Sequence, residues 1–87
     1  MKELEDLRRK IDKIDVEILA LISKRLSIAR GIAEVKKKNN LPIYDPEREK
    51  KLLQKIAQLS KEKSLDENTI EKIYKLLIEY TRNSERC

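Results

Sequence analysis

The feature that most constrains the fold is a regular run of apolar residues in the first half of the chain. Alternate steps of three and four positions, one of them occupied by Arg25, connect Leu4, Leu7, Ile11, Ile14, Ile18, Leu21, Ile28, Ile32 and Val35. Because residues three and four apart share one face of an α-helix, the run predicts a long amphipathic helix over about residues 4–38. At 1.5 Å per residue, about thirty residues of this helix span roughly 45–50 Å, more than so small a chain can cover by itself. The heptad-like spacing therefore favours packing against a second copy, related by two-fold symmetry.

The long helix should end before Pro42, because proline forces the preceding residue out of the helical region and an Asn-Asn pair precedes it. A short loop follows. Asp45 and Pro46 are then typical of an N-cap and of the first residue of a helix. Apolar residues continue at helical spacing, which predicts a second helix over about residues 46–61.

Ser64 and Glu67 have the spacing of a capping box, which indicates the start of a third helix. Its inner face is supplied by Ile70, Ile73, Tyr74, Leu77 and Ile78. This helix is expected over about residues 66–84. With no strand pattern and no linker, the sequence predicts an all-α, three-helix chain in one domain that spans residues 1–87.

Composition limits the chemistry available to the chain. A net charge of +5 fits an anionic partner, whether nucleic acid, an acidic membrane surface or a small polyanion. There is no histidine and the only cysteine is Cys87, so an intrachain disulfide, Cys/His zinc sites and histidine acid–base catalysis are excluded. Without an apolar run of transmembrane length or a signal peptide, we expect a cytoplasmic protein with no membrane partner.

Arg25 is the clearest departure from the apolar pattern. The spacing from Leu21 to Ile28 places it in the middle of the buried stripe. A guanidinium in such a position must either be paired or bind an anion. Two interpretations stay open from periodicity alone: an anion-binding residue, or an ion pair with Asp15 or Glu49 that sets the helix register.

Arg8 and Lys36 flank the same stripe at opposite ends of the long helix. They are about 42 Å apart along one helix, so they cannot bind one small ligand from the same chain. In an antiparallel dimer, Arg8 of one chain can approach Arg25 and Lys36 of the other. Either residue alone also fits a solvated surface charge.

Polar residues also interrupt the inner faces of the other two helices. Glu49, with Arg48 beside it, continues the apolar stripe of the second helix, although it also suits the helix dipole. Thr81 and Glu85 extend the inner face of the third helix beyond Leu77, unless that end frays. Together these groups predict an inward-facing, mostly cationic pocket, which suits a small dianion better than a nucleic-acid backbone.

Four segments carry a resemblance to a known family. They are residues 7–15, 21–25, 33–36 and, most specifically, the run PIYDPERE at 42–49. In this order and spacing they resemble the all-helical chorismate mutases of bacterial and archaeal type, and the likeness covers residues 7–85. The resemblance implies an intertwined homodimer of three-helix chains with two active sites, each completed by the first helix of the partner.

The same resemblance implies that the chain would convert chorismate to prephenate, in the shikimate-derived route to phenylalanine and tyrosine. The reaction is an intramolecular [3,3] rearrangement without cofactor or metal. Arg25 and the partner's Arg8 would bind the two substrate carboxylates, with Thr81 near one of them. Lys36 would bind the ether oxygen and a neighbouring carboxylate. The pocket would hold the flexible side chain over the ring and stabilise charge on that oxygen.

Glu49 would accept the ring hydroxyl, with Asp45 and Arg48 shaping that side. Glu85 stands where many members have a glutamine that donates to the ether oxygen, and an ionised carboxylate cannot donate. We therefore expect Glu85 to work in its protonated form, and we count it with Lys36 and Arg25 as catalytic.

Two alternative functions stay open from the sequence, one an enzyme and the other a non-enzymatic module. An isochorismate-pyruvate lyase would share the fold and the pocket. A non-enzymatic basic module for dimerisation or nucleic-acid binding would show no catalysis and a salt-sensitive affinity for DNA. Because the cations are expected to face inward, we predict no nucleic-acid partner.

Overall fold

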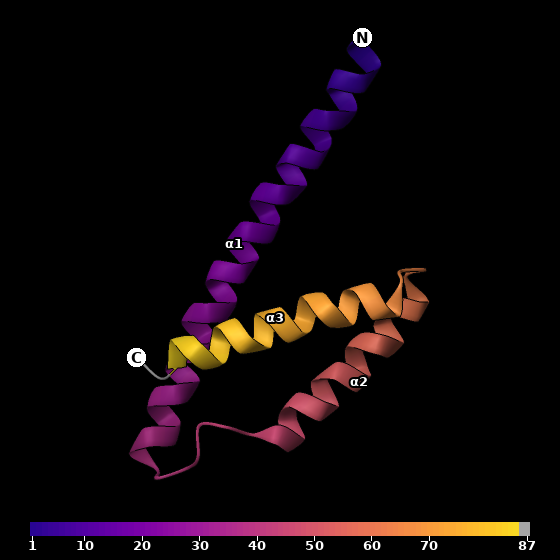
Figure 1. The fold of residues 1–87 in the computed structure, drawn as a ribbon. Helices are drawn as coiled ribbons and strands as arrows, with labels where there is room; N and C mark the ends of the chain where they lie inside the picture. The colour runs from indigo at the N-terminus through magenta and orange to yellow at the C-terminus, as the bar shows by residue number, and fades with distance from the viewer. Residues whose placement is uncertain (86–87) are drawn as a thin grey trace.

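The computed structural model describes residues 1–85, and within this range the chain forms three helices and no strand (Figure 1). They are α1 (Lys2–Lys38), α2 (Pro46–Glu62) and α3 (Glu67–Glu85). The predicted all-α class with a long first helix is confirmed. Each helix begins and ends within two residues of its expected bounds.

The end of α1 is a tight backbone reversal. The amide of Leu41 donates to the carbonyl of Lys36 at 2.8 Å, and the amide of Asn40 donates to that of Lys37 at 3.3 Å. Asn40 takes the left-handed conformation this arrangement requires, with φ of 54°. Asparagine tolerates that conformation better than most residues do, which explains why the Asn-Asn pair ends the helix.

The start of α2 is as the sequence predicts. The Asp45 side chain accepts a hydrogen bond from the amide of Arg48 at 3.1 Å, and Pro46 is the first helical residue. The cap is worth about 1 kcal/mol in typical helices. It also fixes where Arg48 and Glu49 leave the first turn of α2.

The capping-box prediction for α3 is wrong. Ser64 ends α2 instead: its φ is 57°, and its amide donates to the carbonyl of Lys61 at 3.1 Å. The cap of α3 is Asp66, whose carboxylate accepts bonds from the amide of Thr69 at 3.0 Å and from its hydroxyl at 2.6 Å. These bonds hold the pKa of Asp66 below its usual value. The physical reason is that the chain must reverse between α2 and α3, and Ser64 is used in that reversal.

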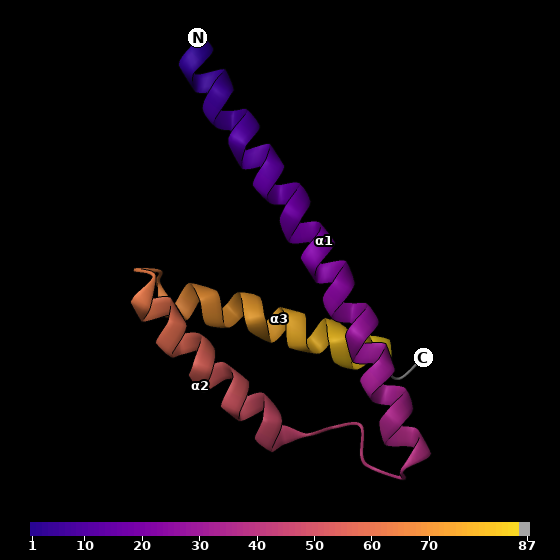
Figure 2. The same ribbon diagram turned by 180° about the vertical axis from the view of Figure 1, so that it is seen from behind.

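The helix α3 packs against both α1 and α2, whereas α1 and α2 do not pack on each other within residues 1–85. In Figures 1 and 2, α2 and α3 form a hairpin, the end of α3 crosses the second half of α1, and the first half of α1 projects away. Leu26, Ala29 and Ala33 are the buried hydrophobic residues of the described chain. All three lie in the part of α1 that α3 crosses, and two of them are small enough to let the helices approach closely.

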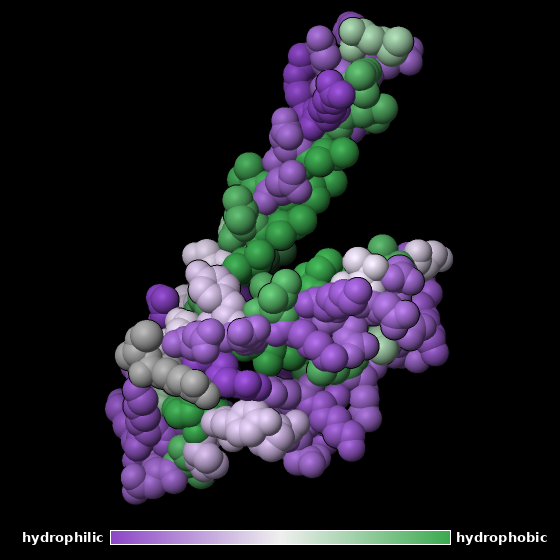
Figure 3. All heavy atoms as spheres, in the orientation of Figure 1, coloured by the Kyte–Doolittle hydropathy of each residue, from purple (hydrophilic) through white to green (hydrophobic). Residues whose placement is uncertain are grey.

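The projecting half of α1 keeps its apolar stripe in the open. Leu4, the least exposed of its predicted stripe residues, is 44% exposed, and Leu21 is 65% exposed. Figure 3 shows hydrophobic side chains along this half of α1, including the side turned toward α3. In the described range no helix is both long and apolar enough to cross a membrane.

Candidate active site

A hollow of about 420 Å³ lies where the second half of α1, the loop before α2, the start of α2 and the end of α3 meet. It is lined by Arg25, Ile28, Ala29, Ile32, Lys36, Ile43, Tyr44, Asp45, Arg48, Glu49, Leu52, Ile78, Thr81, Arg82 and Glu85. Seven of the eight residues singled out from the sequence therefore line one hollow. The eighth, Arg8, is exposed on the projecting half of α1 and does not line it.

Arg25 is half-buried and points to α3. Its guanidinium Nη1 donates to the hydroxyl of Thr81 at 2.5 Å, and that hydroxyl in turn donates to the carbonyl of Leu77 at 2.9 Å. Within the described residues, the ion pairs include none between Arg25 and Asp15 or Glu49. The Arg25 guanidinium is thus held by a neutral partner, which leaves its charge available to an anion.

Lys36 holds the loop that covers one side of the hollow. Its Nζ donates to the backbone carbonyl of Ile43 at 3.0 Å. An ammonium has three N–H donors, so two remain for a ligand. Arg25 and Lys36 are eleven positions apart on α1, three helical turns, and so share its inner face.

Glu49 has a partner that the sequence interpretation missed. Arg82 Nη2 donates to Glu49 Oε1 at 2.6 Å and to Oε2 at 2.7 Å. This hydrogen bond raises the pKa of Arg82 above its usual value. A helical signal did exist, because Arg82 follows Ile78 by four positions and Tyr74 by eight, on the same face of α3.

Arg82 also contacts the loop. Its guanidinium carbon lies 4.6 Å from the centroid of the Tyr44 ring, within range for a cation–π contact. Its Nε is buried without a hydrogen-bond partner in the described structure. Arg82 therefore connects the end of α3 to the start of α2 and to the loop.

The charges around the hollow are unequal. Its lining has four cations, Arg25, Lys36, Arg48 and Arg82, against the three carboxylates of Asp45, Glu49 and Glu85. Two of those carboxylates are engaged, one by Arg82 and the other by the cap of α2. A small anion is the ligand that this lining suits.

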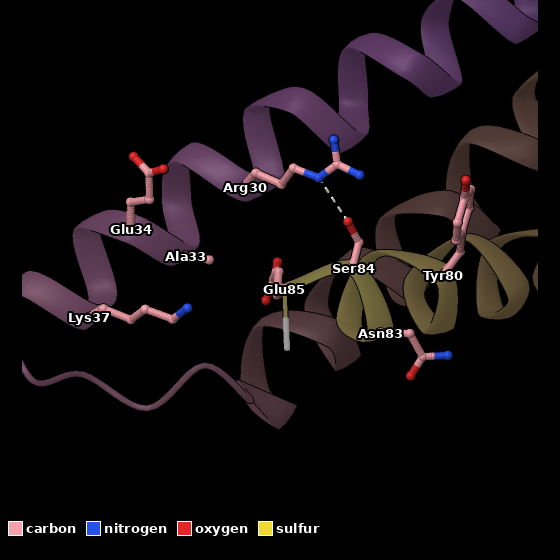
Figure 4. Close-up of a pocket in the computed structure, with 8 residues that line it drawn as sticks. All are labelled: Arg30, Ala33, Glu34, Lys37, Tyr80, Asn83, Ser84 and Glu85. Atoms are coloured by element: carbon pink, nitrogen blue, oxygen red, sulfur yellow. Dashed lines mark hydrogen bonds between the residues drawn. The ribbon is translucent and has the colours of Figure 1, made fainter. Parts of the chain in front are cut away.

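A second hollow, of about 540 Å³, lies between the second half of α1 and the end of α3 (Figure 4). Its lining has two cations, Arg30 and Lys37, and two carboxylates, Glu34 and Glu85. Arg30 Nε donates to the hydroxyl of Ser84 at 3.0 Å, and Glu34 points away from the gap. With balanced charges, this hollow is the less suitable of the two for a dianion. Glu85 lines both.

No group of three or more His, Cys, Asp or Glu residues that could hold a metal ion occurs within residues 1–85. The fold and the first hollow together define an all-helical protein with a cationic pocket for a small anion.

Comparison with known proteins identifies the family. The family model for chorismate mutase type II matches residues 7–86, and the chain belongs to this family. It is 45% identical over 82 residues to a chorismate mutase of Methanocaldococcus jannaschii, covering 94% of this chain and 83% of that protein. A solved chorismate mutase (form II) from Thermus thermophilus superposes with a TM-score of 0.88 at 27% identity, over 97% of this chain and 94% of that one.

Longer proteins also contain the same domain. The chain is 52% identical over 62 residues to a bifunctional chorismate mutase/prephenate dehydratase of Aquifex aeolicus. The aligned part is 71% of this chain but only 17% of that protein. The resemblance stated from the sequence is thereby confirmed at the level of family and fold.

Proposed function

We propose that this chain is a chorismate mutase that converts chorismate to prephenate in a cytoplasmic route to phenylalanine and tyrosine. One observation carries the proposal. Seven of the eight residues that periodicity and resemblance indicate, from α1, the loop, α2 and α3, line a single hollow with an excess of cations. Chorismate carries two carboxylates, so its charge is complementary to that lining.

The proposed residue roles come from the family resemblance, and the contacts of Arg25 and Lys36 are compatible with them. Arg25, held by Thr81, binds one substrate carboxylate with its free N–H groups. Lys36 uses its remaining donors on the ether oxygen and the neighbouring carboxylate. Glu49 accepts the ring hydroxyl, and Glu85 donates to the ether oxygen when its carboxyl carries a proton.

The rearrangement needs no nucleophile, because the C–O bond breaks as a C–C bond forms within one molecule. The protein has to hold the enolpyruvyl arm over the ring and to stabilise negative charge that grows on the ether oxygen. Donors on rigid helices do both. Arg25, Lys36 and Glu85 all stand on α1 or α3, the two helices that cross beside the hollow.

We also propose that the enzyme is an intertwined homodimer in which the partner's Arg8 completes each site. The exposed stripe on the projecting half of α1 supports this, because an apolar surface of that length is normally covered. Arg8 lies on that half, so a partner helix that covers the stripe brings its own arginine along.

The test is to mix the purified protein with chorismate, follow the loss of its ultraviolet absorbance and identify the product. Prephenate formed by the parent protein and lost in Arg25→Ala supports the proposal. Absence of turnover at every pH from acidic to neutral contradicts it. Salicylate and pyruvate formed from isochorismate would favour the lyase alternative instead, and salt-sensitive binding to DNA without catalysis would favour the nucleic-acid module.

A further inference from the structure

We propose that Arg82 is a positioning residue of this site: it orients Glu49 toward the substrate's ring hydroxyl and offsets the negative charge of that carboxylate. The inference rests on the proposed function, because Glu49 is the proposed acceptor. Arg82 was not selected by periodicity or by resemblance, and the contacts in the structure are what single it out.

The geometry of the ion pair between Arg82 and Glu49 supports this role. One nitrogen, Nη2, lies within hydrogen-bond distance of both carboxylate oxygens of Glu49, at 2.6 and 2.7 Å. A carboxylate has about four lone-pair positions, so this contact leaves acceptor capacity on each oxygen. Arg82 therefore fixes the plane of the carboxylate without filling it. The two side chains are only 31% and 26% exposed, which limits screening by water.

Arg82 is itself held in place by its surroundings. Its guanidinium carbon lies over the Tyr44 ring, and its Nε is buried without a hydrogen-bond partner in the described structure. Burial of an unpaired N–H is unfavourable, so the bonds to Glu49 and the ring contact must offset it. A solvated surface arginine would show neither feature. Through these contacts the loop residue Tyr44 and the α2 residue Glu49 share one support on α3.

Arg82 also sets the balance of charge in the lining of the hollow. Without Arg82 the lining would have three cations and three carboxylates, no longer an excess of positive charge. An unpaired Glu49 would then repel a dianion that has to lie beside it. Arg82 thus lets the site keep a hydroxyl acceptor while it attracts carboxylates.

The experiment is a double-mutant cycle on steady-state kinetics. Arg82→Met, which keeps much of the side-chain volume, is measured alone and in the background of Glu49→Gln. We expect Arg82→Met to raise KM about tenfold, the size typical of a lost charge-assisted hydrogen bond. The value of kcat should stay within about twofold, because the hydroxyl contact is present in both bound substrate and transition state. In the Glu49→Gln background the same change should add less than about twofold.

Two further variants separate positioning from folding. Arg82→Lys keeps the charge but lacks the planar group, so its KM should rise less than that of Arg82→Met. If Arg82→Met does not fold, Arg82→Lys takes its place in the cycle. Arg30→Met is the matched control, since Arg30 also joins α1 to α3, through Ser84, but lines the other hollow. It should leave KM unchanged.

An unchanged KM in folded Arg82 variants overturns the inference. An Arg82→Met effect that is equally large with Glu49→Gln also overturns it, because Arg82 would then act without Glu49. A parent protein that does not turn over chorismate overturns the proposed function together with this inference, whereas turnover by the parent with insensitive Arg82 variants overturns the inference alone.

Discussion

At the scale of single residues, two of the three arginines that line the hollow, Arg25 and Arg82, are held in opposite ways. Arg25 donates to a neutral hydroxyl, so its positive charge is not offset by a protein carboxylate. Arg82 donates to the Glu49 carboxylate, so its positive charge is largely offset within the protein. The difference in partner, not in residue type, separates a group free to bind substrate carboxylates from one that positions another side chain.

Glu85 gives the prediction at this scale. The rate of catalysis should increase as the pH is lowered, because only the protonated carboxyl can donate to the ether oxygen. Glu85→Gln supplies a donor at every pH, so it should flatten the pH profile. It should also raise kcat at neutral pH by about tenfold, which is less than the hundredfold or more that one such donor can contribute. The check is kcat against pH for both proteins. A flat profile in the unmodified enzyme would count against a protonated Glu85.

At the scale of elements, α1 and α2 end by the same backbone reversal but with different residues at its left-handed position. The amide of Leu65 donates to the carbonyl of Ser60 at 2.9 Å, as Leu41 does to Lys36 at 2.8 Å. The left-handed residue is Asn40 after α1 and Ser64 after α2. Asparagine is accepted there more readily than serine, so the end of α2 is the more strained of the two.

Ser64→Gly should therefore stabilise the protein by about 1 kcal/mol, because glycine has no Cβ to oppose positive φ. Asn40→Gly is the matched comparison and should give a smaller gain. Urea unfolding of the parent, Ser64→Gly and Asn40→Gly, all at the same protein concentration, measures the differences in free energy of unfolding. A loss of stability in Ser64→Gly would mean that the flexibility of glycine in the unfolded chain outweighs the relief of strain.

A second prediction for an element concerns Gly31, an exposed glycine inside α1. A Cβ built there meets nothing within 4 Å in the chain. Gly31→Ala should stabilise the helix by about 0.5–1 kcal/mol, the usual difference in helix propensity. Thermal unfolding and sedimentation are the checks. If Gly31→Ala does not raise the thermal stability and weakens self-association in sedimentation, a partner helix passes close to Gly31.

The elements also show which parts of the structure were predictable from sequence. Apolar periodicity and Pro42 placed the helices, because both act locally along the chain. The cap of α3 was assigned wrongly, since the role of Ser64 depends on how α3 folds back onto α2. Arg82 was missed for a related reason: its partners Tyr44 and Glu49 come from two other segments, and only the folded chain brings them together.

At the scale of the whole molecule, one chain is too open to be compact. Its radius of gyration is 16.5 Å, against about 12 Å for a compact domain of this length. Its accessible surface is 7523 Å², against about 5400 Å² for a compact monomer of this mass. This excess surface of roughly 2000 Å² is larger than the 800 Å² or so that each partner buries in an ordinary interface. The proposed intertwined dimer requires an excess of that size. The stripe from Leu4 to Leu21 accounts for part of it.

In the proposed dimer each active site takes one arginine from each chain, which mixing of two inactive variants can test. Arg8→Ala and Arg25→Ala should each be nearly inactive alone. After mixing and subunit exchange, a mixed dimer has one site with both arginines and one with neither. Random pairing makes half of the dimers mixed, so activity should recover to about a quarter of the parent's per chain. Recovery to that level places the two arginines of one site on different chains, whereas no recovery despite demonstrated exchange would mean that Arg8 does not serve its partner's site.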